Sequence, residues 1–395
     1  MADPWLTIIG LGEDGLAGLS EASRAALAAA EIVFGAPRHL ALAGAGDRGR
    51  EWPIPFGIDP VLAEAGRKVV VLASGDPFWF GAGGSLAARL QPGEWTCHPA
   101  PSTFSLAAAR LGWRLEETLC LALHAAPFER LVPVLARGVH AICLLRDAAA
   151  AGELAGWLAD KGFGASRLTV LESLGGPEER LRTVSAGGFD LPDVRHPVAV
   201  AVAAAGAAGM PRASGLADEL FAHDGQITKR PVRALTLSAL APRPGEVLWD
   251  LGAGSGSVSV EWCLAAPGAS AHPVEARPDR TGNIRANASA FGLAHRITVT
   301  EARWAEVLAS LPAPDAVFIG GGADKAGIDT LWDLIPQGAR LVVNAVTLDS
   351  EVLLAGCHAR RGGTLLRIEL AAAEPLGRLR GWQPARPVVQ WSAVK

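Results

Sequence analysis

The stretch from Leu248 to Trp262, LWDLGAGSGSVSVEW, runs from an apolar segment through a glycine-rich loop into a weakly amphipathic segment. This order predicts a strand, a nucleotide-facing loop and a helix. In dinucleotide-binding folds the loop reads GxGxxG, and its third glycine lets the helix pack closely. Here Gly252, Gly254 and Gly256 form GxGxG, and Ser257 stands where that third glycine would fall. The loop is therefore wrong for NAD.

Two acidic residues narrow the ligand further. Asp250 ends the predicted strand, where a carboxylate can accept a hydrogen bond from a cationic amino group or orient the loop amides. Glu275 ends the next apolar run, 19 residues beyond Gly256, where it can accept both ribose hydroxyls of a nucleoside. An adenosine that carries a cationic amino acid satisfies both acids, which predicts S-adenosylmethionine. The predicted contacts are Asp250, Gly252, Ala253, Gly254, Ser255, Gly256 and Glu275.

A later strand end supplies candidates for contact with the adenine. The segment VTEARWAEVL, residues 299–308, places Ala302 and Trp304 just after a predicted strand, where they can line an adenine slot. An ordinary core or surface position explains Trp304 equally well.

The second half of the chain repeats one pattern of short apolar runs separated by helical segments. This alternation predicts a doubly wound, mostly parallel sheet. Only a turn-rich loop, AAAEPLGRLRGWQPAR, separates the last two runs, which permits an antiparallel final strand because a parallel return needs a helical crossover. The predicted strands are Glu246–Asp250, Ala271–Glu275, Arg296–Thr300, Pro314–Ile319, Arg340–Asn344, Thr364–Leu370 and Pro387–Trp391.

The first half is also predicted to be α/β, but it is less regular. WLTIIGLG, RKVVVLASGDP, VHAICLL and RLTVLES read as strands, and Ser20 is placed to cap a helix that runs through Ala30. The run VAVAVAAAGAAGMPRASG, which begins at Val198, reads as a last strand and a linker. We therefore expect one domain at residues 1–207 and another at residues 208–395.

Composition excludes several classes of protein. The net charge of −4 gives no basic footprint for nucleic acid, and no stretch approaches an uninterrupted membrane span. The beginning of the sequence lacks the basic start and apolar core of a secretion signal, which predicts a cytoplasmic protein. The five cysteines lack CxxC pairs and the nine histidines lack ligand spacing, so we expect no disulfide and no metal.

Three segments of the second half resemble the decarboxylating precorrin methyltransferases of cobalamin synthesis. They are FAHDGQITKRPVRALTLSAL (221–240), VFIGGG (317–322) and VVNAVTLDSE (342–351). The resemblance implies cofactor contacts from Thr228, Glu275, the 252–256 loop and the 302–304 turn, including Ala302 and Trp304. It implies that the tetrapyrrole lies over the strand ends, near Gly321, Gly322, Asn344 and Thr347.

Three segments of the first half resemble the tetrapyrrole methylases, whose fold has two α/β subdomains with a cofactor cleft between them. They are LTIIGLGEDGLAGLS (6–20), ASGDPFWFG (73–81) and PAPSTFSLAAARLG (99–112). The resemblance implies that residues 1–207 form two such subdomains, split near residue 112. Related enzymes often have Pro-Gly-x-Ser in the third loop, where this chain has Pro-Ser-Thr-Phe-Ser. The resemblance implies that Gly75, Asp76, Pro77, Gly81, Ser102 and Thr103 contact the cofactor, and that Gly10 and Gly12 border the substrate cleft.

The combination resembles bifunctional enzymes that carry both families in one chain. It implies that each domain binds S-adenosylmethionine. One domain would methylate carbon 5 of a precorrin, and the other would remove carbon dioxide from the ring C acetate and methylate carbon 15. Both families commonly form homo-oligomers, which predicts one here by analogy. A methyltransferase acting on RNA or protein, and a non-catalytic sensor of the cofactor, remain alternatives.

Few titratable residues are candidates for the decarboxylation. His223 and Asp224 lie nearest to the predicted cofactor loop, although a capped turn over the cofactor also explains them. The neighbouring Lys229, Arg230 and Arg233 can bind substrate carboxylates or form a solvated helix face. Arg378 and Arg380 precede the last strand, and we hypothesise that they clamp substrate carboxylates.

Overall fold

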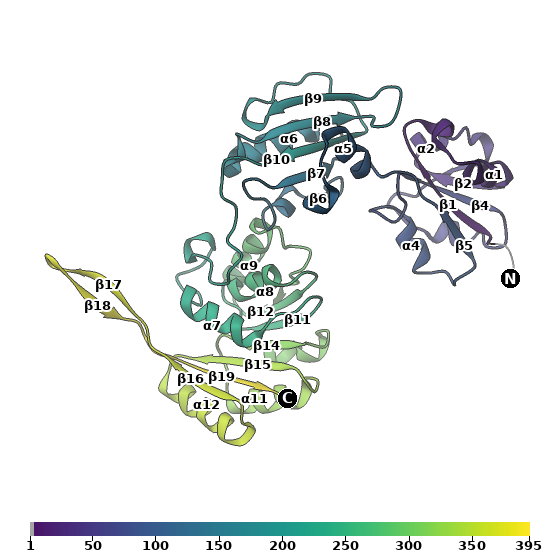
Figure 1. The fold of residues 1–395 in the computed structure, drawn as a ribbon. Coiled ribbons are helices and arrows are strands. Elements are labelled where there is room, and N and C mark those ends of the chain that lie inside the picture. The colour runs from purple at the N-terminus through teal and green to yellow at the C-terminus, as the bar shows by residue number, and fades with distance from the viewer. Residues whose placement is uncertain (1–3) are drawn as a thin grey trace. The chain divides into compact units, whose positions relative to one another are not determined.

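The computed structural model describes residues 4–395, and the chain folds into two compact units. The first unit contains the described residues up to Phe128 together with Leu135–Ala208. The second contains Glu129–Val134 and Gly209–Lys395. Each unit is built on its own sheets, drawn in Figure 1, and is described by itself.

The first unit begins with a wholly parallel sheet in the order β3-β2-β4-β1-β5. Ser20 caps α1 as predicted, because its side chain accepts a hydrogen bond from the Ser23 amide at 3.1 Å. The strands are β1 (Leu6–Leu11), β2 (Ile32–Gly35), β3 (Gly49–Glu51), β4 (Val69–Ser74) and β5 (Trp95–His98). The helices are α1 (Glu21–Ala29), α2 (Pro37–Leu42), α3 (Asp59–Leu62) and α4 (Gly83–Ala87).

The second sheet of this unit is mixed, in the order β6-β7-β10-β8-β9. Its middle strand β10 runs antiparallel to both neighbours, and Phe104 and Ala107 of α5 pack against this sheet. The strands are β6 (Thr118–Ala122), β7 (His140–Leu144), β8 (Arg167–Glu172), β9 (Arg180–Ser185) and β10 (Val198–Ala203). The helices are α5 (Thr103–Leu111) and α6 (Ala149–Leu158).

The second unit contains a seven-stranded sheet in the order β13-β12-β11-β14-β15-β19-β16. The strands are β11 (Val247–Leu251), β12 (Ser270–Glu275), β13 (Thr300–Glu301), β14 (Ala316–Ile319), β15 (Arg340–Ala345), β16 (Thr364–Ile368) and β19 (Val388–Val394). The helices are α7 (Arg230–Leu240), α8 (Ser257–Ala265), α9 (Pro278–Ala290), α10 (Trp304–Val307), α11 (Lys325–Leu334) and α12 (Leu348–Arg361).

The predicted doubly wound, mostly parallel sheet is confirmed, and its final strand in the sequence is antiparallel, as the short connection permits. The strands from β13 to β15 are parallel, and β19 runs antiparallel to β15 and β16. Apolar side chains of α7, α8 and α9 pack on one face, and those of α11 and α12 pack on the other. The third strand is shorter than predicted, because upstream of Thr300 only an isolated bridge joins Ile297 to Ala271.

The prediction of a turn-rich loop before the last strand is wrong. Residues 371–384 form a two-stranded antiparallel hairpin of β17 (Ala371–Leu376) and β18 (Leu379–Pro384), which Figure 1 shows standing out from its sheet. Gly377, with φ of +61°, begins the two-residue turn, the conformation that makes tight hairpins possible. The alternation that marks a half-buried strand is missing because nearly every residue of the hairpin is exposed.

Within residues 4–395, no helix combines the length and the apolar character needed to cross a lipid bilayer.

Candidate functional site

The predicted cofactor residues of the second unit lie at the carboxyl ends of neighbouring parallel strands. β11 pairs with β12 on one side and with β14 on the other, so the chain order reverses at β11. Ligands of open α/β sheets bind at such a switch point. The loops that follow these three strands therefore form the candidate site of this unit.

The glycine loop requires its glycines for two different reasons. Gly252, Gly254 and Gly256 all have positive φ, between +59° and +70°. A Cβ on Gly252 would lie 2.7 Å from the Gly321 carbonyl oxygen, and one on Gly256 would lie 2.8 Å from Ile284. A Cβ on Gly254 would instead meet only the Gln226 carbonyl oxygen, at an ordinary contact distance of 3.9 Å. The outer glycines permit close packing, whereas the middle one leaves the backbone open to a ligand.

Glu275 holds this loop through the backbone. Its two carboxylate oxygens accept hydrogen bonds from the Gly254 amide at 2.9 Å and from the Arg277 amide at 3.0 Å. The side chain is only 6% exposed, so its geometry is fixed in advance of any ligand. Each oxygen keeps a second lone pair for a ribose hydroxyl.

Asp250 is fully buried beneath the loop. Its Oδ2 accepts hydrogen bonds from the Ser259 hydroxyl at 2.7 Å and from the Ser259 amide, while Oδ1 has no partner. Burial raises the pKa of Asp250 to about 6, against the opposing effect of the Ser259 hydrogen bonds. Ser255 Oγ is likewise buried without a partner. Two unsatisfied polar atoms in one loop match a site that a polar ligand completes.

The segment before α7 lies over the glycine loop. A Cβ on Gly254 would have the Gln226 carbonyl oxygen as its nearest neighbour, at 3.9 Å. Asn287, 2% exposed, exchanges hydrogen bonds with the Ala222 backbone and donates a further one to the Ser255 carbonyl oxygen at 2.9 Å. Sequence analysis missed Asn287, because an amide on a polar helix gives no signal of burial.

His223 and Asp224 occupy a turn of this covering segment. His223 Nδ1 accepts a hydrogen bond from the Gly225 amide at 3.0 Å. Asp224 accepts from Arg280 Nε at 2.9 Å and from the Gln226 amide, and these two hydrogen bonds lower the pKa of its carboxyl. An ionised Asp224 is poorly suited to donating a proton, so of the two predicted catalytic residues only His223 is a candidate proton donor.

Three basic residues at the start of α7 are predicted to bind substrate carboxylates or to lie on a solvated helix face. Lys229 and Arg230 are exposed, but for Arg233 both predictions are wrong because it is buried. Its side chain is 0% exposed and donates to Glu261 at 2.6 Å, to Asp218 at 3.1 Å and to the carbonyl oxygens of Leu216 and Thr228. Thr228 therefore lies at the junction between the covering segment and this ion pair. Arg233 fixes the segment and is not accessible to a substrate carboxylate.

In the first unit, the predicted site residues border a cavity of about 850 Å³ that is lined from both of its sheets. Gly12, Gly75, Gly81, Ser102 and Thr103 line it. The volume lies in the upper part of the roughly 300–1,000 Å³ range of small-molecule sites. Asp76 and Pro77 instead shape its turn: Asp76 Oδ1 accepts from the Phe78 amide at 2.9 Å, and the Pro77 carbonyl oxygen accepts from the Gly83 amide.

Backbone packing explains the two central glycines of this region. A Cβ on Gly10 would lie 1.9 Å from the Gly75 carbonyl oxygen, which itself accepts a hydrogen bond from the Ala100 amide. Gly75 has φ of +55° and lies against Pro101 and Ser102. Gly10 is therefore needed beneath the cavity wall and does not line the cavity.

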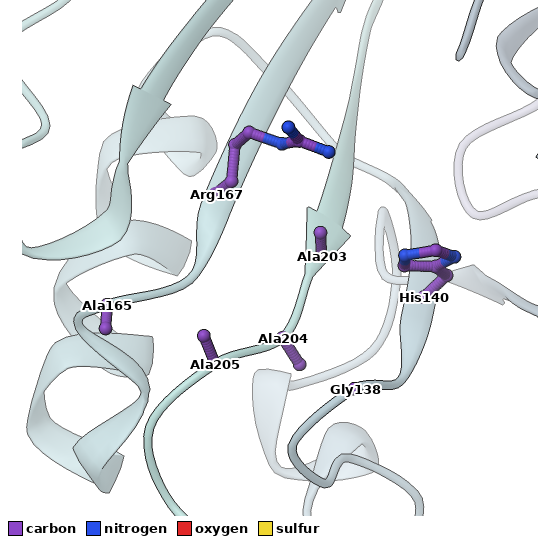
Figure 2. A pocket seen from close by; sticks show the side chains of 7 residues that line it. All are labelled: Gly138, His140, Ala165, Arg167, Ala203, Ala204 and Ala205. Atoms are coloured by element: carbon purple, nitrogen blue, oxygen red, sulfur yellow. The ribbon is translucent and has the colours of Figure 1, made fainter. Parts of the chain in front are cut away.

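A smaller hollow of about 290 Å³ lies at the other end of the second sheet (Figure 2). Ala203 pairs in register with His140 on one side and Arg167 on the other, and alanine side chains form much of the lining. His140 also stacks on Trp113, with ring centroids 4.2 Å apart. This hollow is too small for a nucleoside and a macrocycle together.

Comparison with known proteins finds family models that match both units. A family model described as the precorrin methyltransferase domain matches residues 219–395, and one described as tetrapyrrole (corrin/porphyrin) methylases matches residues 5–190. A protein of Sinorhizobium sp. named precorrin-6Y C(5,15)-methyltransferase [decarboxylating] is 48% identical over 404 residues, which span 100% of this chain and 97% of that protein. The chain belongs to the family of decarboxylating precorrin-6Y C(5,15)-methyltransferases.

Another member of this family, from Mycobacterium tuberculosis strain H37Rv, is 40% identical over 99% of this chain and 100% of its own length. Among solved structures, the C-terminal domain of precorrin-6Y C5,15-methyltransferase from Rhodobacter capsulatus is 56% identical. It covers 47% of this chain and 100% of that chain, with a TM-score of 0.46. The family resemblance predicted from the sequence motifs is confirmed.

The remaining predicted residues of the second unit differ in how well they suit contact with a ligand. Trp304 is 9% exposed and packs in the core with Ile328 and Leu331, so its indole does not form an open adenine slot. Ala302 lies at the rim, where its amide donates to the Glu275 carbonyl oxygen at 3.1 Å.

The strand ends predicted to hold the substrate are partly occupied by internal hydrogen bonds. Asn344 donates to Thr236 at 3.0 Å and accepts from Gln390 at 3.0 Å, and Thr347 caps α12 through the Ser350 amide. Gly321 and Gly322 are exposed and carry no side chain, which leaves space above β14.

The predicted carboxylate clamp lies on the projecting hairpin. Arg378 lies in the turn of the projecting hairpin and Arg380 pairs across it with Pro375, and both are exposed. The hairpin leaves the seven-stranded sheet beside Ala345, at the edge where β15 ends, and projects from it.

The described residues 4–395 contain no group of three or more His, Cys, Asp or Glu side chains that could hold a metal ion.

The first-unit cavity does contain a polar cluster that sequence analysis missed, formed by Glu13, Arg38, His39 and Ser74.

Proposed function

We propose that this chain methylates a precorrin at carbons 5 and 15 and removes carbon dioxide from its ring C acetate, as a step of cobalamin biosynthesis. The supporting observation is 48% identity, along the whole chain, to a protein named for that reaction. We further propose that residues 1–207 methylate carbon 5 and residues 208–395 perform the decarboxylation and the methylation of carbon 15. Each part binds its own S-adenosylmethionine.

The loop residues of the second unit fit this cofactor. The free Oδ1 of Asp250 and the free Ser255 Oγ supply a buried acceptor and a hydroxyl, and Glu275 keeps acceptor capacity for two ribose hydroxyls. The open φ-positive backbone at Gly254 lets a nucleoside approach closely. In the first unit, the Gly75 turn, Gly81 and the Ser102 loop line a cavity of sufficient volume.

Positioning is the main contribution that we assign to the protein. Bound S-adenosylmethionine supplies an electrophilic methyl group whose leaving group is neutral. Holding the acceptor carbon in line in a dry site contributes roughly 7–11 kcal/mol, whereas a general acid or base contributes only about 3–5 kcal/mol. Rigid loops such as the one tied by Glu275 and Asn287 supply that positioning.

Decarboxylation requires the macrocycle to accept the electrons of the departing carboxylate. A proton donor beside the ring favours that flow, and His223 in the covering segment is the residue we propose for it. Asp224, held ionised by Arg280, orients the segment instead.

The assembly and location of the chain remain predictions. The exposed apolar side chains of the β17–β18 hairpin, including Leu376 at 69%, Leu379 at 77% and Trp382 at 76%, support a homo-oligomer. We expect a cytoplasmic protein.

The full chain incubated with methyl-labelled cofactor and a precorrin tests the proposal. We expect a product that has gained two methyl groups and lost one carbon dioxide, and calorimetry should show two equivalents of cofactor bound per chain. A single bound equivalent, or label found only in RNA or protein, contradicts the proposal.

A further inference from the structure

We propose that the first-unit cavity orients the tetrapyrrole by two contacts: Arg38 pairs with a peripheral carboxylate of the macrocycle, and Trp79 and Phe80 stack against its ring face. This inference rests on the proposed function and adds the residues that select and orient its substrate.

The aromatic contact follows from side chains that are unusually exposed. Trp79 and Phe80 line the cavity with 38% and 54% of their surface accessible, and both rings lean on Phe104, at centroid distances of 5.0 and 5.9 Å. Phe80 has φ of +59°, a conformation rare for a bulky residue. Such strain persists where the surroundings impose it and is common at ligand sites.

The turn that presents these rings is rigid. A Cβ on Gly81 would lie 2.5 Å from the Pro77 carbonyl oxygen, so the chain must close tightly just after Phe80. Another aromatic pair, Trp52 and Phe56, also lines the cavity, with centroids 5.1 Å apart. Flat apolar surfaces on a cavity of this size suit a broad conjugated ligand better than a flexible one.

The cationic contact is held in place by its neighbours. Arg38 Nη2 lies 2.9 Å from His39 Nε2 and donates to Ser74 Oγ at 3.1 Å, while Nη1 pairs with Glu13. His39 Nε2 is also 2.8 Å from Ser74 Oγ. The planar guanidinium is thus fixed at the cavity wall, and a substrate carboxylate that displaces Glu13 can take its place on the guanidinium.

The cluster holds one cation, Arg38, and one anion, Glu13. Burial, together with the Arg38 charge, lowers the pKa of His39 to about 4, so the imidazole is neutral at pH 7 and leaves Arg38 as the cation of the cluster. His39 is 7% exposed and its Nδ1 has no partner. Glu13 balances Arg38 in the free protein, and a substrate carboxylate competes with it for the guanidinium.

The carboxylate can come from the substrate side chains or from the amino-acid part of the cofactor, and the test separates these sources. The measurements on the full chain are the KM for the precorrin in carbon 5 methylation and the Kd of S-adenosylmethionine. For Arg38→Gln we expect the precorrin KM to rise at least tenfold while cofactor Kd stays within twofold. For Trp79→Leu we expect the precorrin KM to rise three- to tenfold. For Trp79→Phe we expect a smaller rise, because an aromatic ring is retained.

Arg89→Gln is the matched control, because Arg89 is an exposed arginine of the same unit outside the cavity lining. An unchanged precorrin KM in both Arg38→Gln and Trp79→Leu overturns the inference, as does a loss of cofactor affinity alone in Arg38→Gln. If thermal unfolding shows that Arg38→Gln is destabilised, Arg38→Lys replaces it, with the same expected direction. A wild-type chain that methylates no precorrin overturns the proposed function instead.

Discussion

The two candidate sites are built in opposite ways. In the second unit, the loops at the carboxyl ends of the parallel strands are held by hydrogen bonds between backbone groups and three buried side chains. These are the carboxylates of Glu275 and Asp250 and the amide of Asn287. In the first unit, side chains from segments far apart in the sequence, such as Arg38, Ser74 and Phe80, line a cavity. Rigid backbone suits the placement of a cofactor, whereas side-chain walls suit the selection of a substrate.

The largest effect that tests this contrast is expected at Arg233. Removing one partner of a buried ion pair leaves an uncompensated charge and costs about 3–5 kcal/mol. Because Arg233 and Glu261 tie the covering segment to α8, Arg233→Leu should destabilise the second unit by that amount. Chemical unfolding monitored by circular dichroism measures it, with the exposed Lys229→Ala as control. Equal stability of the two variants would mean that the ion pair does not hold the site together.

A smaller loss of stability is expected at Gly10 in the first unit. A Cβ there would lie 1.9 Å from the Gly75 carbonyl oxygen, and overpacking of this kind costs about 1–3 kcal/mol. Gly10→Ala should therefore shift the cavity wall and weaken carbon 5 methylation while leaving carbon 15 chemistry intact. Gly84→Ala, which meets nothing within 4 Å, is the control. Loss of both reactions in Gly10→Ala would show that the units do not act independently.

The contrast also explains which parts the sequence could predict. Asp250, Gly252 and Glu275 lie in or just after one strand–loop–helix unit, so their spacing in the sequence was enough to predict a nucleoside site. Arg38 and His39 are separated by more than 30 residues from Ser74, and only the fold brings them together. Arg233 was misassigned because charge usually indicates exposure, and its buried acidic partner is distant in sequence. The hairpin was missed because an exposed strand pair has no apolar alternation.

Titration should distinguish the two cofactor sites. The folded pKa of Asp250, about 6, lies above its ordinary value of 3.8, so ionising it costs stability as pH rises through 6. A cationic amino group bound at Oδ1 favours the ionised form. We therefore expect cofactor affinity of the second unit to be about tenfold weaker at pH 5 than at pH 7.

Calorimetry at several pH values provides that measurement. Asp250→Asn should bind more weakly at pH 7 and lose the pH dependence, while the first-unit site should keep the same affinity in both proteins. A pH slope that survives in Asp250→Asn would assign the titration to another group.

The smallest effect is expected for the hairpin arginines. Arg378 and Arg380 are exposed on a hairpin that projects from the sheet, so replacing both with alanine should change the KM of the second reaction less than twofold. The hypothesis of a carboxylate clamp predicts a clear rise instead. If KM does rise, the hairpin contributes to a substrate site, and its exposed apolar residues make a site in a neighbouring subunit the one to test. In that case Leu379→Ser with Trp382→Ser, which removes exposed apolar contacts and keeps both arginines, should raise KM equally and lower the oligomeric mass.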